Sequence, residues 1–294
     1  MFSRSQTLFA ALITTALAAA LWGSLCNPVH SAHGAESGGV DALPAEQIAS
    51  RLRSAYPGLI KDIEGNNVVF VDGTRLPLDD GQRNKSFNDW LGAPDIEDMF
   101  RIPYVAGDAK SSPAINSDPG RARNSAFFAK IYGDCRGANF AKSLVDVVWL
   151  PKKSGQKLKV SKTNGAAERL TAVSQELDAM PASFGAYLIP SAGTYNCRVV
   201  AGTKNMSAHS YGIAIDIALK HAHYWRWTKA SGSGAISYKN DIPMEIVRVF
   251  EKHGFIWGGK WHHYDTMHFE YRPELLPPQT PIAPQPVDPI SAPN

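Results

Sequence analysis

The stretches SAHSYGIAID (residues 207–216) and YDTMHFE (residues 264–270) carry the strongest structural pattern of the chain. Together they supply two imidazoles and a carboxylate, a donor set that suits a zinc ion with an open fourth position for water. These candidate ligands are His209, Asp216 and His268. Asp265 lies three residues before the last histidine. A further carboxylate beside a zinc-bound water serves metal-assisted hydrolysis, so the two stretches in this order predict a hydrolytic zinc site.

The first stretch continues into a predicted strand, GIAIDIAL at residues 212–219. Its isoleucines alternate with smaller residues, which places Asp216 on the face opposite the isoleucines and hence opposite the expected core. Gly212 permits a backbone bend that a larger residue would resist. Residues 255–257 and 268–271 are further strand candidates. The two histidines therefore come from a loop and a distant strand, and the fold has to bring them together.

Hydrophobic periodicity predicts helices near residues 44–55 and 243–253, with another between them that begins after residues 163–164 and is closed by Pro181. The apolar stripe of the second helix consists of Leu170, Val173, Leu177 and Met180. Thr163 or Asn164 is the expected cap of that helix. The pattern thus alternates between helices and strands without an internal repeat.

The remaining elements are short. Residues 63–78 read as a hairpin around Asp72-Gly73, a typical turn pair. Residues 144–150 form a predicted strand, with residues 157–160 as its neighbour. Residues 87–100 mix aromatic and acidic side chains and are expected to form a loop and a short helix.

The 294 residues and a formal charge of +3 describe an ordinary globular chain with one sizeable domain or one domain and a small appendage. This charge is too small to indicate a nucleic-acid partner. Residues 1–35 resemble a secretory signal peptide, with Arg4 before an apolar run at residues 8–21. The alternative is an N-terminal membrane anchor, although the run is short for a span. We expect export to the periplasm or the extracellular space and no stable membrane span after signal removal.

Two cysteines, Cys135 and Cys197, remain after the expected cleavage. An oxidising compartment favours one disulfide between them, with two unpaired buried thiols as the alternative. Residues 277–294 are rich in proline and lack aromatic side chains, so we expect a disordered tail.

The pattern Ser207-x-His209-x-x-Gly212-x-Ala214-x-Asp216, followed by Asp265-x-x-His268, resembles the signature of the D-Ala-D-Ala carboxypeptidase family of zinc peptidases. That family includes VanY-type and VanX-type enzymes and phage endolysin peptidases, which cut cell-wall peptides at or near D-amino acids. The resemblance implies an α+β fold in which a small central antiparallel sheet, flanked by helices, carries the zinc. It covers roughly residues 144–276.

From this resemblance we expect four segments: a signal peptide at 1–35, an N-terminal extension at 36–130, a zinc peptidase domain at 131–276 and the tail at 277–294. Within the domain, the resemblance implies zinc ligation by the two histidines and the aspartate named above.

The resemblance also implies roles for residues beside the ligands. Asp265 takes the position of the general base, as Asp in the endolysin type rather than Glu as in the VanX type. Ser207 matches a position that helps hold the substrate, and Arg198 is the nearest candidate for the arginine that stabilises the carbonyl oxygen. Trp261 and His263 are candidates for lining the substrate cleft, and the alternative for His263 is an exposed or supporting role.

Two functions follow from these assignments. The first is a zinc-dependent peptidase that acts on peptidoglycan peptides, either as a D,D-carboxypeptidase or as an endopeptidase. The alternative is an exported, zinc-stabilised cell-wall-binding protein without turnover. Asp265 favours the peptidase, because a protein that only binds has no need of a base.

Overall fold

The structure is a computed structural model that describes residues 43–108, 112–201, 203–228 and 236–278. The expected signal peptide and the tail beyond residue 278 lie outside the described residues. All described residues belong to one compact unit. Within this part of the chain no helix combines the length and the apolar character needed to cross a bilayer.

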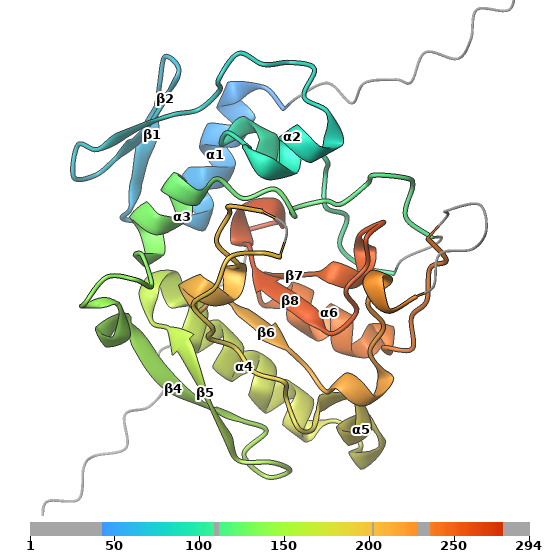
Figure 1. Cartoon of the computed structure of the whole chain (residues 1–294). Coiled ribbons are helices and arrows are strands. Elements are labelled where there is room, and N and C mark those ends of the chain that lie inside the picture. The colour runs from blue at the N-terminus through green and yellow to red at the C-terminus, as the bar shows by residue number, and fades with distance from the viewer. Residues whose placement is uncertain (1–42, 109–111, 202, 229–235, 279–294) are drawn as a thin grey trace, which may run out of the picture. The chain divides into compact units, whose positions relative to one another are not determined.

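A three-stranded antiparallel sheet lies at the centre, in the order β6–β8–β7 (Figure 1). These strands are β6 (Ala214–Asp216), β7 (Phe255–Trp257) and β8 (His268–Tyr271). In the register of β6 and β8, Ile215 faces Phe269 and Asp216 faces His268. Because side chains alternate along a strand, Asp216 and His268 share one face while Ile215 and Phe269 share the other.

The expected core face of this sheet is confirmed. Ile213, Ile215 and Ile217 are each at most 1% exposed, although the strand itself is shorter than residues 212–219. Phe269 stacks on Phe250 with ring centroids 3.8 Å apart and contributes the middle of the apolar layer. Because these rings and isoleucines are buried on one face of the sheet, the opposite face, which carries Asp216 and His268, points away from the core.

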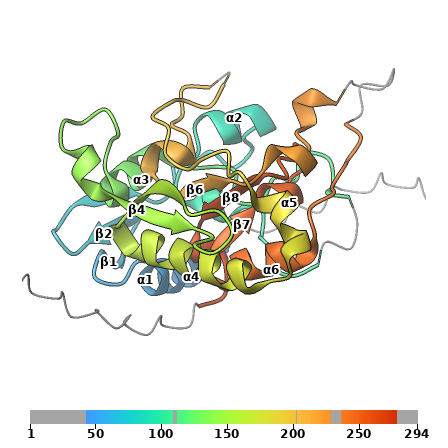
Figure 2. The ribbon, with the colours of Figure 1, turned by 90° about the horizontal axis from the view of Figure 1, so that it is seen from below.

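Helices α4 (Ala166–Ala179) and α6 (Met244–Lys252) supply the other side of that core. Figure 2 shows them together on one side of the strands, with α2 (Phe87–Gly92) on the other. The prediction for the start of α4 was wrong, because neither Thr163 nor Asn164 caps it with a side chain. Gly165 takes the N-cap position with φ +72°, after a short 3-10 turn.

Strands β4 (Leu144–Trp149) and β5 (Gln156–Ser161) pair antiparallel, as expected. The Ser161 amide donates to the Gly212 carbonyl at 2.8 Å and joins this pair to the loop before β6. Gly212 has φ +68°, and a Cβ there would lie 2.7 Å from a methyl of Leu144 and 3.0 Å from the Ser161 nitrogen. Both the backbone conformation and the close approach therefore require glycine.

The residues before 131 pack on the same core rather than apart from it. They form α1 (Ala45–Ala55), a meander of β1 (Ile60–Glu64), β2 (Asn67–Phe70) and β3 (Arg75–Pro77), then α2 and α3 (Ser125–Tyr132). The Tyr56 hydroxyl donates to the buried Glu274 at 2.8 Å. A short helix, α5 (Gly185–Leu188), completes the set of α-helices among the described residues. The fold is α+β, as expected, and the boundary at residues 130/131 remains a prediction from the sequence.

Candidate metal centre and active site

Three donor atoms meet on the polar face of the central sheet. His209 Nε2 lies 3.2 Å from His268 Nδ1 and 3.3 Å from Asp216 Oδ1. His268 Nδ1 lies 2.8 Å from the same carboxylate oxygen. Among the described residues, these side chains form a His/Asp/His group whose ligand atoms all lie within 4.8 Å of one another. The structure therefore brings together the three ligands that the sequence predicts.

Each histidine ring is held by its other nitrogen. His209 Nδ1 bonds the Thr194 carbonyl oxygen, so a proton on Nδ1 leaves Nε2 free to donate its lone pair. His268 Nε2 lies 2.9 Å from Glu270 Oε1, which leaves Nδ1 for the same purpose. Outer hydrogen bonds of this kind fix the tautomer and the ring orientation of metal-ligating histidines.

The pKa values of Asp216 and His268 show that the His/Asp/His group needs a positive charge. Burial opposes ionisation of this carboxyl, but hydrogen bonds and charges from His209 and His268 hold its pKa far below its ordinary range. Burial likewise lowers the pKa of His268, yet Asp216 and Glu270 together raise it to about 10. Three lone-pair donors at one point need a positive charge between them, which is a proton on His268 or a divalent cation in its place. The donor set thus fits a metal ion.

Glu270 also contacts this group, although no role was predicted for it from the sequence. Its side chain is fully buried, and Oε1 accepts from both His268 Nε2 and Arg123 Nη1, the latter at 2.6 Å. Burial opposes ionisation, but Arg123 and His268 lower the pKa of Glu270 to about 2. The spacing His268-x-Glu270 on one strand is a sequence pattern that could have revealed it, because alternate residues share a face.

Asp265 lies beside the group with an unpaired carboxylate oxygen. Its Oδ1 is buried and has no hydrogen-bond partner among the described residues. Its backbone carbonyl accepts from the His268 amide at 3.2 Å, which ties it to β8. Burial raises the pKa of Asp265 to about 6, and the charges of His268, Asp216 and His209 all act on it. A buried carboxylate without a partner is costly unless it serves a ligand or a reaction.

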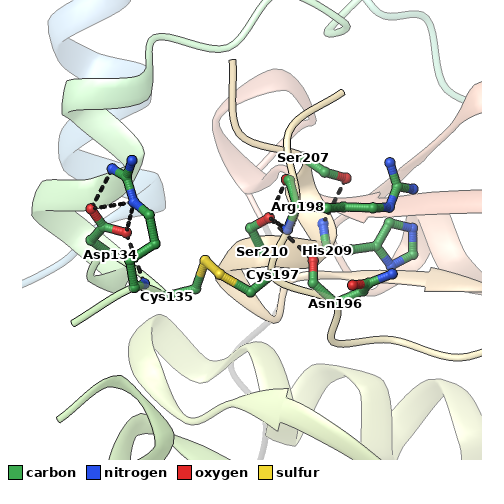
Figure 3. The surroundings of a disulfide bond; sticks show 9 residues. Asp134, Cys135, Asn196, Cys197, Arg198, Ser207, His209 and Ser210 are labelled. Carbon is green, nitrogen blue, oxygen red and sulfur yellow. Dashed lines mark hydrogen bonds and ion pairs between the residues drawn. A yellow bond between two sulfur atoms is a disulfide. The ribbon is translucent and has the colours of Figure 1, made fainter. Parts of the chain in front are cut away.

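Ser207 and Arg198 lie on the loop that carries His209 (Figure 3). Ser207 caps a 3-10 helix at Ala208–Tyr211, and its hydroxyl accepts from the His209 amide at 3.4 Å. The Arg198 amide donates to the Ser210 hydroxyl at 2.9 Å, and the Arg198 carbonyl accepts from the Ser207 amide at 3.0 Å. The Arg198 side chain is exposed, and in Figure 3 it extends toward His209 rather than toward the disulfide.

The disulfide links Cys135 to Cys197, as expected, with Cα atoms 5.7 Å apart and a sequence separation of 62 residues. Its second cysteine directly precedes Arg198. The bridge and the Ser210 hydroxyl, which donates to the Arg198 carbonyl at 2.6 Å, therefore fix the same short segment from two sides.

Trp261 and His263 occupy different surroundings. Trp261 is 3% exposed, and its ring centroid lies 5.7 Å from that of His268, so it packs behind the ligand. His263 Nδ1 lies 2.9 Å from a carboxylate oxygen of Asp118, and its ring stacks on Phe87 at 5.0 Å. His263 also lines a small cavity next to the site. The substrate contacts proposed for both residues remain predictions.

A second group of side chains that could coordinate a metal lies far from the first in sequence. Asp79, Asp80 and Asp95 also have ligand atoms within 4.8 Å of one another. Here the side chain of Lys85, 3% exposed, places its ammonium 2.7 Å from Asp80 and 3.2 Å from Asp95. The chain itself therefore supplies the cation of this acidic group.

Comparison with known protein families gives one match, to the family described as D-alanyl-D-alanine carboxypeptidase, over residues 201–271. Searches of curated proteins and of solved structures found no match to this chain. The matched segment contains both parts of the motif: His209 and Asp216 in the first, Asp265 and His268 in the second. The matched part of the chain, which builds the His/Asp/His group and its neighbouring carboxylate, is similar to the D-alanyl-D-alanine carboxypeptidase family.

Proposed function

We propose that this chain is an exported zinc-dependent peptidase that hydrolyses peptidoglycan peptides at or next to D-amino acids. One observation carries the proposal: the three donor atoms converge while a buried, unpaired carboxylate, Asp265, lies beside them. The family match over residues 201–271 supports the reaction class.

In this proposal His209, Asp216 and His268 hold the zinc. Bound there, zinc supplies a Lewis acid and lowers the pKa of a bound water to about 7. Two histidines and one carboxylate are a usual protein set for a catalytic zinc with an open position.

The chain's own residues perform the proton transfers and the charge stabilisation. Asp265 accepts a proton from the attacking water and passes it to the leaving amine, because its free Oδ1 has no competing partner among the described residues. Arg198 offers guanidinium donors to the carbonyl oxygen as negative charge develops there. Its backbone is fixed by Ser210, so the exposed side chain can reach out from a rigid base.

We also propose export, with cleavage after roughly residues 31–35. The Cys135–Cys197 disulfide supports this, because such bonds persist in oxidising compartments. N-terminal sequencing of the mature protein tests the cleavage. An intact Met1 in the membrane fraction would indicate an anchor instead.

The decisive test of the activity is incubation of purified muropeptides with the mature protein, with and without a chelator, followed by mass analysis of the products. We expect loss of one or more amino acids next to a D-residue, abolished by the chelator and restored by zinc. The matched control is Asp265→Asn, which is expected to retain zinc. Unchanged muropeptides under all conditions would refute the activity, and turnover that survives the chelator would refute the role of zinc.

A further inference from the structure

A cavity of about 300 Å³ lies next to the candidate active site and is lined by residues from five segments of the chain. Its walls include Phe87 and Leu91 of α2, Arg121 and Arg123, Asn205 and Trp225. This volume is at the lower end of the range of ordinary small-ligand sites. Asn205 donates to the Leu91 carbonyl at 2.7 Å, so α2 and the loop before Ser207 close the cavity together.

The charge of this cavity is one-sided. Arg121, Arg123 and Arg226 line it, and its described lining contains no aspartate or glutamate. We call these three residues with Trp225 the arginine pocket. Several guanidinium groups beside an aromatic wall form a recognition surface for a carboxylate, which guanidinium binds with two parallel hydrogen bonds.

Two of the arginines have unused donors. The side chain of Arg123 is 10% exposed, and its buried Nε has no hydrogen-bond partner among the described residues. Arg226 is exposed, and its guanidinium lies 5.0 Å from the Trp225 ring centroid without an ion pair in the described part of the chain. A buried donor without a partner points to a ligand that supplies the acceptor.

The pocket is coupled to the reaction site through its own walls. Arg123 binds Glu270, and Glu270 binds the ring of the ligand His268. Arg121 lies over the ring of Trp261, 5.6 Å from its centroid, and the centroid of that ring lies 5.7 Å from that of His268. The pocket wall also includes His263, two residues before Asp265, which has to reach the leaving amine of the substrate.

Building on the proposed function, we infer that the arginine pocket receives a carboxylate of the residue that leaves the scissile bond. Two sources offer this chemistry: the terminal α-carboxylate of a peptide, or an acidic side chain on the leaving residue. In the first case the enzyme is a carboxypeptidase. In the second it also cleaves peptides that continue beyond the leaving residue.

The test uses four peptides with the mature zinc-loaded protein. They are acetyl-L-Lys-D-Ala-D-Ala as free acid and as amide, and the amides of acetyl-L-Lys-D-Ala-D-Glu and acetyl-L-Lys-D-Ala-D-Gln. We expect kcat/KM to fall about 10- to 100-fold when the carboxylate is replaced by an amide, mainly through KM, because charge-assisted hydrogen bonds are lost. Activity on the D-Glu amide would show that a side-chain carboxylate suffices.

The variants assign the effect to the pocket. Arg226→Gln is expected to reduce the preference for acid over amide, measured as the ratio of the two kcat/KM values, by about tenfold. Arg226→Lys is expected to keep part of the preference, since it keeps the charge but not the fork of donors. Arg248→Gln is the matched control, because Arg248 is an exposed arginine on α6 that pairs with Asp108. An unchanged preference in Arg226→Gln, or equal losses for acid and amide, would overturn the inference.

Binding separates this inference from the proposed activity. Calorimetry with chelator-treated protein measures the affinity for acid and amide without turnover. Tighter binding of the acid that disappears in Arg226→Gln supports the pocket even if no peptide is cleaved. Equal binding of acid and amide overturns the pocket even if zinc-dependent cleavage is observed.

Discussion

Two groups of side chains have the spacing of metal ligands, but they differ in which charges balance their carboxylates. Both the His/Asp/His group and the Asp79/Asp80/Asp95 group gather ligand atoms within 4.8 Å. In the acidic group, burial opposes the charged ammonium of Lys85, but the hydrogen bonds that it donates to Asp80, Asp98 and Asp95 raise its pKa above the ordinary value. In the histidine group no lysine or arginine contacts Asp216 among the described residues.

This difference shows that proximity of ligand-type atoms is not enough to identify a metal site. In the histidine group no lysine or arginine among the described residues balances the carboxylate of Asp216. Hydrogen bonds from the rings to Thr194 and Glu270 orient the free ring nitrogens of His209 and His268 toward one point. The acidic group is an ion-pair cluster with its own cations. Lys85 contacts Asp80, Asp95 and Asp98, and Arg83 contacts Asp79, so the cluster ties the segment before α2 to the segment after it. The predictions below test this distinction, from the largest expected effect to the smallest.

The largest effect is expected from His268→Ala. Removal of one of three ligands should reduce the zinc content from one ion per chain to none and abolish zinc-dependent hydrolysis. Metal analysis after gel filtration measures the content, and His221→Ala, whose ring contacts Tyr187 away from the group, is the control. Full zinc retention in His268→Ala would remove this residue from the ligand set.

Asp265→Asn separates chemistry from metal binding. An amide cannot accept the proton of the water, while its shape is nearly conserved, so kcat should fall by about 10²- to 10⁴-fold with zinc content unchanged. Steady-state kinetics on a muropeptide provides the measurement. Near-normal turnover would place the base elsewhere, with His263 as the next candidate.

Lys85→Met tests the acidic group. Removal of the buried cation leaves carboxylates without compensation, so the free energy of unfolding should fall by about 3–5 kcal/mol with zinc content unchanged. Urea denaturation measures the change. The control Lys130→Met removes a partner of the exposed Asp72 and should cost less than about 1 kcal/mol. A variant as stable as the control would mean that the cluster is not held by Lys85.

Glu270→Gln tests the support behind the metal ligand. The neutral amide holds the ring of His268 less firmly and makes Nδ1 a weaker donor, so zinc affinity should fall by about 10- to 100-fold. Competition with a chromophoric chelator measures the affinity. Glu251→Gln is the control, because Glu251 is also a buried acid that pairs with a lysine, Lys260. Equal affinities in the two variants would show that Glu270 does not support the metal.

Local sequence pattern was sufficient to predict the residues of the His/Asp/His group and most helices and strands. The alternation in GIAIDIAL placed Asp216 opposite the core, and the motif spacing placed His268 on a second strand. These features depend on neighbours in sequence, so a single chain reveals them.

Residues that act through long-range contacts could not be predicted. Arg123 meets Glu270 across 147 residues, and Asn205 holds α2 from more than 110 residues away. The prediction for the start of α4 was wrong because Gly165, in the left-handed conformation, takes the N-cap position, while the Asn164 side chain donates to the distant Ala55 carbonyl. Hydrogen-bond partners that the tertiary structure brings together from distant segments leave no periodic pattern in the local sequence.

The register of β6 against β8 also has a consequence for how the protein matures. Asp216 faces His268 only in this alignment, and a slip by one residue would turn His268 toward the apolar side of the sheet. A chain with mispaired strands would therefore lack the full ligand set and would not gain the binding energy of the ion. In the proposed zinc peptidase, zinc uptake would then select for correctly paired chains, and the zinc content of a preparation would report the fraction of molecules whose strands have found their proper alignment.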